Sequence, residues 1–246
     1  MRWMIYGFSL FLFLGSVGAV TIAFLLYKYG KGLPDYGQLA NYKPPVVTRV
    51  HSGDGRLLAE YAKERRVFIP VSVMPKLLIK AFLSSEDKNF FEHSGIDPVS
   101  LMNAAINNLL NIYKDKRPRG ASTITQQVAK NFLLSNELSL ERKIKEAILA
   151  FRIEKAFSKS RILELYLNEI YLGMGSYGVA AAALNYFDKS LDELTVEEVA
   201  YLAALPKAPN NYHPVRKKSA ATARRNWVIQ KMHENGFISK TTMELA

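Results

Sequence analysis

Residues 84–95 gather most of the residue types that carry out proton transfer. They read Ser-Ser-Glu-Asp-Lys-Asn-Phe-Phe-Glu-His-Ser-Gly, and the apolar residues 81–83 come directly before them. A carboxylate held against apolar surface loses hydration, which disfavours its charged form and suits a general acid or base. Glu86 is the carboxylate that this pattern favours. The competing interpretation is an ordinary charged helix end at Glu86 and Asp87, and this stretch alone does not decide between them.

A second polar group follows Gly120 and opens a predicted helix. Ser122 is the predicted N-cap, because a hydroxyl after glycine is a common helix start. Ser122, Gln126 and Lys130 recur every four residues and therefore share one face, with Thr123 and Gln127 alongside. A helix N-terminus with hydroxyls, amides and a lysine suits an oxyanion such as phosphate. A capped surface helix would give the same pattern, so the alternative stays open.

A third group lies on a predicted amphipathic helix over residues 139–157. Arg142 and Glu146 are one turn apart, with Lys143 beside them. The simplest interpretation is an exposed intrahelical ion pair, which contributes only a few tenths of a kcal/mol. The predicted buried stripe of this helix consists of Leu140, Ile144, Ile148 and Phe151.

Most of the remaining chain has a helical pattern. Further helices are predicted over residues 98–113, 161–172, 179–187, 195–205 and 220–235. A small β element precedes them, with strands at 46–50, 56–61 and 66–69 and a turn at 52–55. Glu164 and Asn168 interrupt an otherwise apolar helix, so we expect them to hold neighbouring elements together. Gly173, Gly175 and Gly178 predict close helix packing and a tight turn.

The N-terminal residues predict an uncleaved membrane anchor. No charged side chain occurs between residues 3 and 27, and a helix rising roughly 1.5 Å per residue would span a bilayer over that length. Residues 31–45 are rich in proline and glycine and predict a linker. Counting the positive charges on each side of the anchor weakly places the large domain inside the cell.

Composition narrows the classes of partner. The formal net charge of the 246 residues is +11, which favours nucleic acid, an acidic membrane surface or a phosphorylated substrate. The chain contains no cysteine, so disulfide scaffolds, thiolate nucleophiles and zinc–thiolate sites are excluded. The basic residues 114–120 follow an apolar helix. They form either a solvated loop or a mobile flap over acidic lipid head groups.

Taken together, the motifs resemble the peptidoglycan glycosyltransferase domain (glycosyltransferase family 51) of bifunctional class A penicillin-binding proteins, ending before the transpeptidase domain. The resemblance rests on residues 86–95, 120–127, 142–146 and 161–168, with a looser match at 224–229. Ala121 stands where the family usually has a second glycine. The resemblance implies a mainly α fold with a lysozyme-like helical lobe, a smaller membrane-associated lobe, a short N-terminal β element and an N-terminal transmembrane helix.

The domain boundaries expected from this resemblance start with a transmembrane anchor over residues 1–30 and a linker over 31–45. The glycosyltransferase domain would cover residues 46–240, with a membrane-facing flap at about 100–120, and 241–246 would begin a further linker. The implied reaction joins lipid II units into β-1,4 glycan strands with inversion at the anomeric carbon and release of undecaprenyl pyrophosphate.

The resemblance also implies roles for individual residues. Glu86 would be the base that takes a proton from the acceptor 4-hydroxyl, and Glu146 the second catalytic carboxylate, which orients the donor, its pyrophosphate or a metal ion. Asp87 would orient Glu86, and His93 would brace the turn. The implied substrate-binding residues are Asp87, Ser122, Thr123, Gln127, Lys130, Asn131, Arg142 and Lys143. No cofactor is obligatory, and a divalent cation such as Mg²⁺ or Mn²⁺ would be an optional addition near Glu146.

The implied partners are lipid II, the growing glycan strand, membrane lipid, moenomycin-type inhibitors and other cell-wall synthesis proteins, with no nucleic acid. Because lipid II is presented on the outer face of the bacterial inner membrane, the resemblance places the domain on the periplasmic side of a single-pass anchor and overrules the charge count. A lysozyme-like glycan hydrolase or lytic enzyme is the alternative enzyme class. A tethered, non-enzymatic module that binds anions is the alternative outside enzymes.

Overall fold

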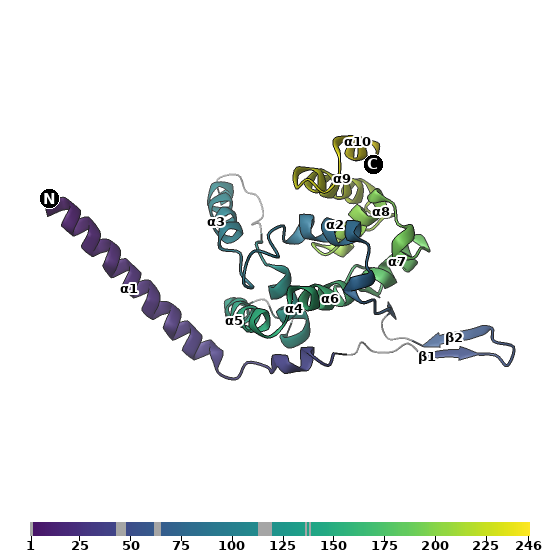
Figure 1. The fold of residues 1–246 in the computed structure, drawn as a ribbon, viewed down its shortest axis with the longest axis horizontal. Helices are drawn as coiled ribbons and strands as arrows, with labels where there is room; N and C mark the ends of the chain where they lie inside the picture. The colour runs from purple at the N-terminus through teal and green to yellow at the C-terminus, as the bar shows by residue number, and fades with distance from the viewer. Residues whose placement is uncertain (1, 43–47, 62–64, 113–119, 136, 138) are drawn as a thin grey trace.

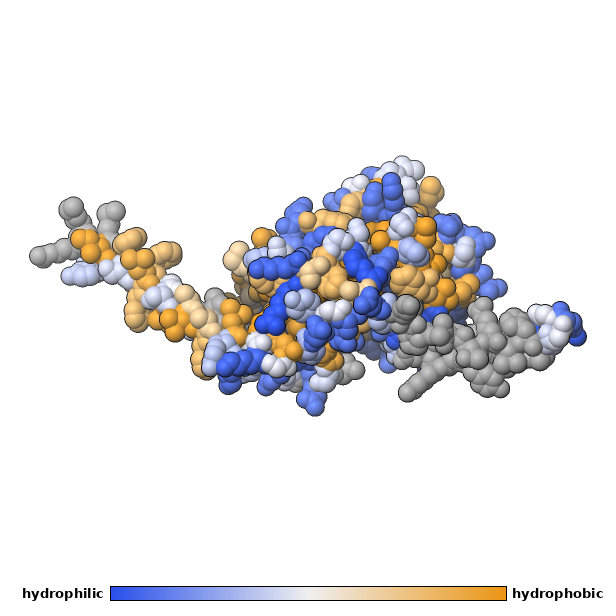
Figure 2. All heavy atoms as spheres, turned by 60° about the horizontal axis from the view of Figure 1, so that its bottom comes forward, coloured by the Kyte–Doolittle hydropathy of each residue, from blue (hydrophilic) through white to orange (hydrophobic). Residues whose placement is uncertain are grey.

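The computed structural model describes residues 2–42, 48–61, 65–112, 120–135, 137 and 139–246. The chain begins with the helix α1 (Arg2–Gly30), which extends away from a body built of helices (Figure 1). Residues Ile5–Gly30 of this helix are long and apolar enough to cross a membrane, and none of their apolar window is buried inside the protein. Figure 2 shows this largely apolar arm beside a body of mixed polarity. The predicted N-terminal apolar helix is therefore present.

The expected linker after α1 is partly a docked segment. It contains the short helix η1 (Tyr36–Leu39), and Leu39 is almost fully buried in the main core. The Arg161 guanidinium donates a hydrogen bond of 2.9 Å to the Leu39 carbonyl, and the Tyr42 hydroxyl donates one of 2.7 Å to Glu169. Burying a leucine stabilises a fold by about 1.5–3 kcal/mol. Residues 36–42 of the predicted linker are thus held against the helical body, while 43–45 lie outside the described residues.

The predicted hairpin is present, but its third strand is not. β1 (Thr48–His51) pairs antiparallel with β2 (Leu57–Tyr61), and the hairpin projects from the body (Figure 1). The part of this prediction that falls on residues 46 and 47 lies outside the described residues. Instead of joining this hairpin, β3 (Arg65–Arg66) pairs in parallel with β4 (Ser176–Tyr177).

Hydrogen bonds to Asn168 explain why residues 66–69 do not form a third strand of the hairpin. Its side chain accepts the backbone N–H of Ile69 and donates to the Ile69 carbonyl, both at 2.8 Å. Glu164 accepts the backbone N–H of Val71, at the start of η2 (Val71–Val73), at 3.0 Å. Two side chains of one helix thus satisfy backbone groups that a neighbouring strand would otherwise pair. The expectation that Glu164 and Asn168 hold neighbouring elements together is confirmed.

The body is helical, as predicted. Its longer helices are α2 (Lys76–Glu86), α3 (Pro98–Ile112), α4 (Ile124–Leu133), α5 (Leu140–Ala156), α6 (Lys159–Glu169), α7 (Val179–Phe187), α8 (Val196–Ala204) and α9 (Lys218–Glu234). The short helices η3 (Leu191–Glu193) and η4 (Pro209–Asn211) flank α8. α2 packs against α8 and α9, whereas α4 packs against α5 and α6. The mainly α fold class is confirmed.

The buried face of α5 differs from the predicted stripe. Leu140 is 78% exposed and Phe151 is 48% exposed, while Arg142, Glu146 and Leu149 face the interior. The prediction is right for Ile148, which is buried, and wrong for Leu140 and Phe151, because it treated the charged residues as the outer face. An ion pair whose partners satisfy each other can be buried, and here it takes the place that apolar side chains were expected to fill.

The apolar face of α3 is exposed in the described part of the chain, where α3 packs closely on no other element. Its large exposed residues are Val99, Leu101, Met102, Ile106, Leu109 and Leu110. Such an exposed apolar face is typical of a surface that contacts a membrane or a partner. The basic part of the predicted flap, residues 113–119, lies outside the described residues.

The C-terminal residues expected to begin a linker form α10 (Lys240–Leu245), which packs against α9. Met243 and Ala246 contact the hydrophobic core. Residues 241–246 are therefore part of the helical body, in contrast to the expected boundary at 240.

Gly178 gives a test of the predicted close packing. Its φ is +78°, and an added Cβ would lie 2.6 Å from the Asn168 carbonyl oxygen. We expect Gly178→Ala to destabilise the fold by about 2–4 kcal/mol, combining left-handed strain with overpacking. Gly236 is the matched control, because its φ is +71° but a Cβ there would meet nothing within 4 Å. Gly236→Ala should cost only about 1–2 kcal/mol. Equal losses in denaturant unfolding of the two variants would contradict the packing argument.

Candidate active site

Glu86 is the last residue of α2 and sits on the apolar surface that the sequence predicts. Ala81, Phe82 and Leu83, in the turn before it, are all buried. Burial raises the pKa of the Glu86 carboxyl, and the neighbouring charge of Asp87 acts in the same direction. The hydrogen bond from Gln127 opposes this shift. Glu86 therefore has the environment of a general base or acid, as its surroundings in the sequence imply.

Asp87 joins three segments of the chain. It caps the C-terminus of α2 and is buried. One carboxylate oxygen accepts the backbone N–H of Ile124 at 2.9 Å, and the other lies 2.9 Å from Nε2 of His93. Both oxygens are engaged inside the protein, so Asp87 is placed to orient its surroundings.

The turn at His93 is held at both ring nitrogens. The Gly95 backbone N–H donates to Nδ1 at 3.2 Å, so Nδ1 is the acceptor and Nε2 carries the proton that points to Asp87. Gly95 has a φ of +96°, and an added Cβ would lie 2.8 Å from the backbone of Ala150. This geometry agrees with the expectation that His93 braces the turn.

The predicted cap of α4 is off by one residue. Thr123, not Ser122, is the N-cap: its hydroxyl accepts the Gln126 backbone N–H at 3.2 Å and donates to the Gly95 carbonyl at 2.6 Å. The Gln126 side chain accepts the Thr123 backbone N–H in return, completing a capping box. The buried Thr123 hydroxyl is thus committed to the framework, although the sequence placed it among the substrate contacts.

α4 presents Gln127 and Lys130 toward the glutamate. Gln127 donates a hydrogen bond of 2.8 Å from Nε2 to Glu86. Burial lowers the pKa of Lys130, the positive charge of Arg142 lowers it further, and Glu86 acts in the opposite direction. Lys130 therefore interacts with both Glu86 and the α5 cluster. Asn131, the next residue, is half-buried and makes no side-chain hydrogen bond among the described residues.

Glu146 lies at the centre of a buried cluster on α5. It is 1% exposed and accepts hydrogen bonds from Arg142 and, at 2.5 Å, from Nζ of Lys143. Lys143 also donates to the Ser122 hydroxyl at 2.9 Å. Burial lowers the pKa of Lys143, and the charges of Arg142 and Lys130 add to this effect. This is not an exposed ion pair: two cations share one buried carboxylate, and Lys130 adds a third nearby.

A metal ion held by the protein does not fit this cluster. Among the described residues, no three His, Cys, Asp or Glu side chains come together as metal ligands. Both oxygens of Glu146, the predicted candidate ligand, are engaged by cationic side chains. The local surplus of positive charge suits an anion instead.

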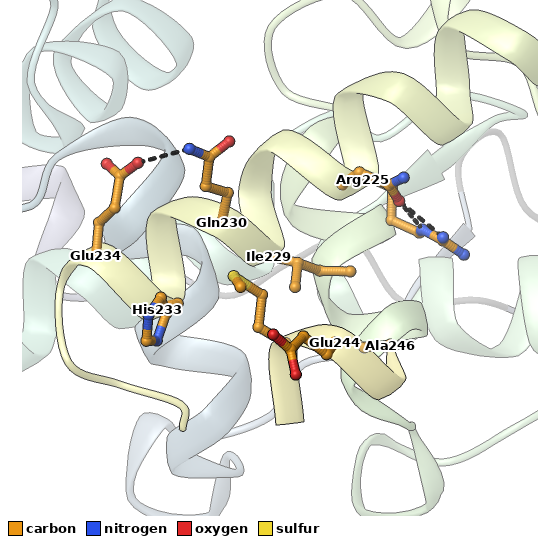
Figure 3. Close-up of a pocket in the computed structure, with 9 residues that line it drawn as sticks. Arg225, Ile229, Gln230, His233, Glu234, Glu244 and Ala246 are labelled. Atoms are coloured by element: carbon orange, nitrogen blue, oxygen red, sulfur yellow. Dashed lines mark hydrogen bonds between the residues drawn. The ribbon is translucent and has the colours of Figure 1, made fainter. Parts of the chain in front are cut away.

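A pocket elsewhere is separate from this site. It lies between α9 and α10, with Arg225, Ile229, His233 and Glu244 among its lining residues (Figure 3). None of the predicted site residues lines it. It is therefore separate from the predicted catalytic and substrate-binding residues, although residues of the looser 224–229 motif line it.

Two cations outside the predicted set act on Glu86. Arg224 on α9 and Lys207, in the loop after α8, both favour the charged form of the carboxylate. Arg224 opens the motif at 224–229, but nothing in the sequence distinguishes it from Arg225 beside it. Only the packing of α9 on α2 distinguishes Arg224 from Arg225 as the arginine that acts on Glu86.

Comparison with known proteins gives matches that span the region of these motifs. The chain matches the family model described as Transglycosylase over residues 54–233. It is 53% identical to penicillin-binding protein 1A of Rickettsia prowazekii over 97% of this chain and 30% of that protein. It is 45% identical to penicillin-binding protein 1A of Aquifex aeolicus over 98% of this chain and 32% of the relative. The identity to the Escherichia coli protein of that name is also 45%, over 87% of this chain and 25% of the relative.

The chain thus spans about a third or less of the length of these relatives. The resemblance drawn from the motifs is confirmed, and the chain belongs to the transglycosylase family.

Proposed function

We propose that this domain is a peptidoglycan glycosyltransferase that polymerises lipid II into β-1,4 glycan strands. Glu86 takes the proton of the acceptor 4-hydroxyl, and the oxygen attacks the donor anomeric carbon from the face opposite the pyrophosphate. The new glycosidic bond forms with inversion as undecaprenyl pyrophosphate leaves with the bonding electrons. The family match supports the reaction class, and the site geometry supports the assignment of roles.

The observation that carries this proposal is the position of Glu86 beside a cationic group. Gln127 fixes one oxygen of the carboxylate, while Lys130, one turn further along α4, interacts with both Glu86 and Arg142. A base and an anion-binding group therefore lie on neighbouring parts of one site. An inverting transfer to a sugar hydroxyl needs that arrangement. The acceptor hydroxyl loses its proton on one side of the anomeric carbon, while negative charge develops on the departing pyrophosphate on the other side.

Lys130, Arg142 and Lys143 are proposed to stabilise the departing pyrophosphate. Glu146 holds Arg142 and Lys143 in place within the cluster, so its part in catalysis is to orient these cations. Ser122 fixes the Lys143 ammonium from the other side. Preorganised charges of this kind need little rearrangement as negative charge develops.

A lipid-linked substrate also accounts for the apolar features. α1 would anchor the chain in the bacterial inner membrane with the body on the periplasmic side, and the exposed apolar face of α3 would rest in the interface. Moenomycin-type inhibitors would then occupy the cationic part of the site.

Glu86→Gln should lower polymerisation of lipid II by about 100- to 10,000-fold, because the amide cannot accept the hydroxyl proton. Glu92→Gln is the matched control, since Glu92 lies in the same motif but is exposed, and its activity should match the unaltered chain. Product analysis separates the classes of enzyme: growing glycan strands support the proposal, while soluble reducing sugars without chain growth would identify a hydrolase. Full polymerisation by Glu86→Gln would show that the base is another group.

The pH range over which the enzyme is active should be narrower than the ordinary pKa values of glutamate and lysine imply. The base works only when ionised, and burial raises the pKa of Glu86. Activity should therefore fall on acidification at a higher pH than for a solvent-exposed glutamate. Burial lowers the pKa values of Lys130 and Lys143, so the cations should be lost below the usual range for lysine. Measurement of kcat/KM against pH checks both limbs, and an acid limb at the ordinary glutamate pKa would contradict the assignment.

A further inference from the structure

Arg224 is a partly buried cation that pairs with no anion among the described residues. Its Nε is fully buried and finds no hydrogen-bond partner in the described part of the chain, where Arg224 also forms no ion pair. The guanidinium lies 3.8 Å from the centre of the Trp227 ring, one turn along α9. Removing a charge from water without a partner is costly, so an unpaired arginine at this position requires another explanation.

The carboxylate whose charge acts on Arg224 is Glu86. Arg224 belongs to α9, which packs directly against α2, the helix that ends at Glu86. The Trp227 ring fixes one face of the guanidinium and so limits where the charge can lie. An arginine keeps its charge at any working pH, which sets it apart from the lysines of the site.

The charged and titratable groups that act on Glu86 come from several elements. Asp87 disfavours the ionised carboxylate, while Lys130 on α4 interacts with it favourably. Tyr166 on α6 is buried, and burial together with the charges of Glu86 and Asp87 raises its pKa well above the ordinary value, so it stays neutral. Arg224 and the exposed Lys207 supply positive charge from the α8–α9 side.

Without positive charge on that side, burial and Asp87 would both favour the protonated glutamate, which is not a base. Lys130 cannot fill this role alone, because it also faces the positive charge of Arg142. Gln127 contributes a neutral hydrogen bond and no charge. Arg224 is therefore the partly buried cation on α9 that can keep Glu86 ionised in its apolar setting.

We propose that Arg224 is a positioning residue for the transfer reaction: its partly buried guanidinium, stacked on Trp227 of the helix that packs against α2, supplies positive charge to Glu86 and keeps this carboxylate ionised and ready to accept the acceptor proton. Lys207 contributes in the same direction from the loop after α8. Arg224 acts through Glu86 and not by contact with substrate. The inference rests on the function proposed above, in which Glu86 is the base.

The test is the dependence of kcat/KM on pH for lipid II polymerisation by the full chain in detergent. Arg224→Gln should move the acid limb upward by about one pH unit, the lower end of the effect of a nearby opposite charge. Activity below that limb should fall about tenfold and should recover at higher pH. Arg224→Lys keeps the charge and should restore most of the original profile. Lys207→Gln, at an exposed position, should move the limb in the same direction by less.

Arg225→Gln is the matched control. Arg225 is the next residue of α9, but its guanidinium is bonded to Asn226 and acts on Glu197 instead of Glu86. The acid limb of the Arg225→Gln profile should not move. An unmoved acid limb in Arg224→Gln would overturn the proposal whatever Lys207→Gln shows, and a lower melting temperature with equal loss of activity at every pH would show Arg224 to be structural only.

Measuring Glu86→Gln in parallel distinguishes a wrong role for Arg224 from a wrong assignment of Glu86 as the base. An inactive Glu86→Gln beside an unmoved Arg224→Gln profile refutes the role of Arg224 and leaves the base assignment intact. An active Glu86→Gln refutes the base assignment itself, and the role of Arg224 with it.

Discussion

The site depends on the buried carboxylate of Asp87. It binds the backbone N–H that begins α4 and the ring of His93, while its own backbone closes the last turn of α2. Glu86 and Gln127 come from different helices, and the 2.8 Å contact between them requires those helix ends to meet in one register. Without Asp87, an unpaired N–H and a loosened turn would lie directly beside Glu86, the proposed base. A charge-assisted hydrogen bond to a backbone donor is a strong way to hold such a junction.

The two carboxylates of the site are placed in opposite environments. Glu86 lies on apolar surface with one neutral hydrogen bond, whereas Glu146 is enclosed by two cations that bond to it directly. The first environment makes a carboxylate a better proton acceptor, and the second pairs the carboxylate with two cations in a structural role. Two residues of one type thus serve different tasks because their surroundings differ, which is a general way of separating acid–base roles. The cations that Glu146 holds retain a net positive charge for an incoming anion.

Local patterns predicted much of this fold. α7 begins and ends at the predicted residues, because a run of alanines between glycine and aspartate has clear boundaries. The cap of α4 was also readable: Thr123 and Gln126 have the capping-box spacing, which should have selected Thr123 over Ser122. The strand predicted at 66–69 failed for a different reason. Its partner groups belong to Asn168, about 100 residues away, and no local pattern carries that information.

The errors within the site have one physical origin. On α5, charged residues were expected to face outward, yet Arg142 and Glu146 satisfy each other and turn inward. On α9, Arg224 and Arg225 are identical in type and adjacent, so only the packing of that helix shows which one faces Glu86. Hydropathy describes a residue in water, whereas the state of a buried charge depends on partners that are distant in sequence.

The docked segment after α1 connects the predicted anchor to the chemistry. Leu39 is buried in the main core, Arg161 on α6 holds the carbonyl of Leu39, and Arg152 on α5 donates to the last carbonyl of α1 at 3.4 Å. α5 carries the cationic cluster and packs directly on α1. A flexible tether would let the body sample many heights above a bilayer. These contacts instead join the end of the apolar helix to the helices of the site, so the anchor and the anion-binding side chains are placed together. For the proposed substrate, whose pyrophosphate would lie at a fixed depth, these contacts would supply part of the positioning that catalysis needs.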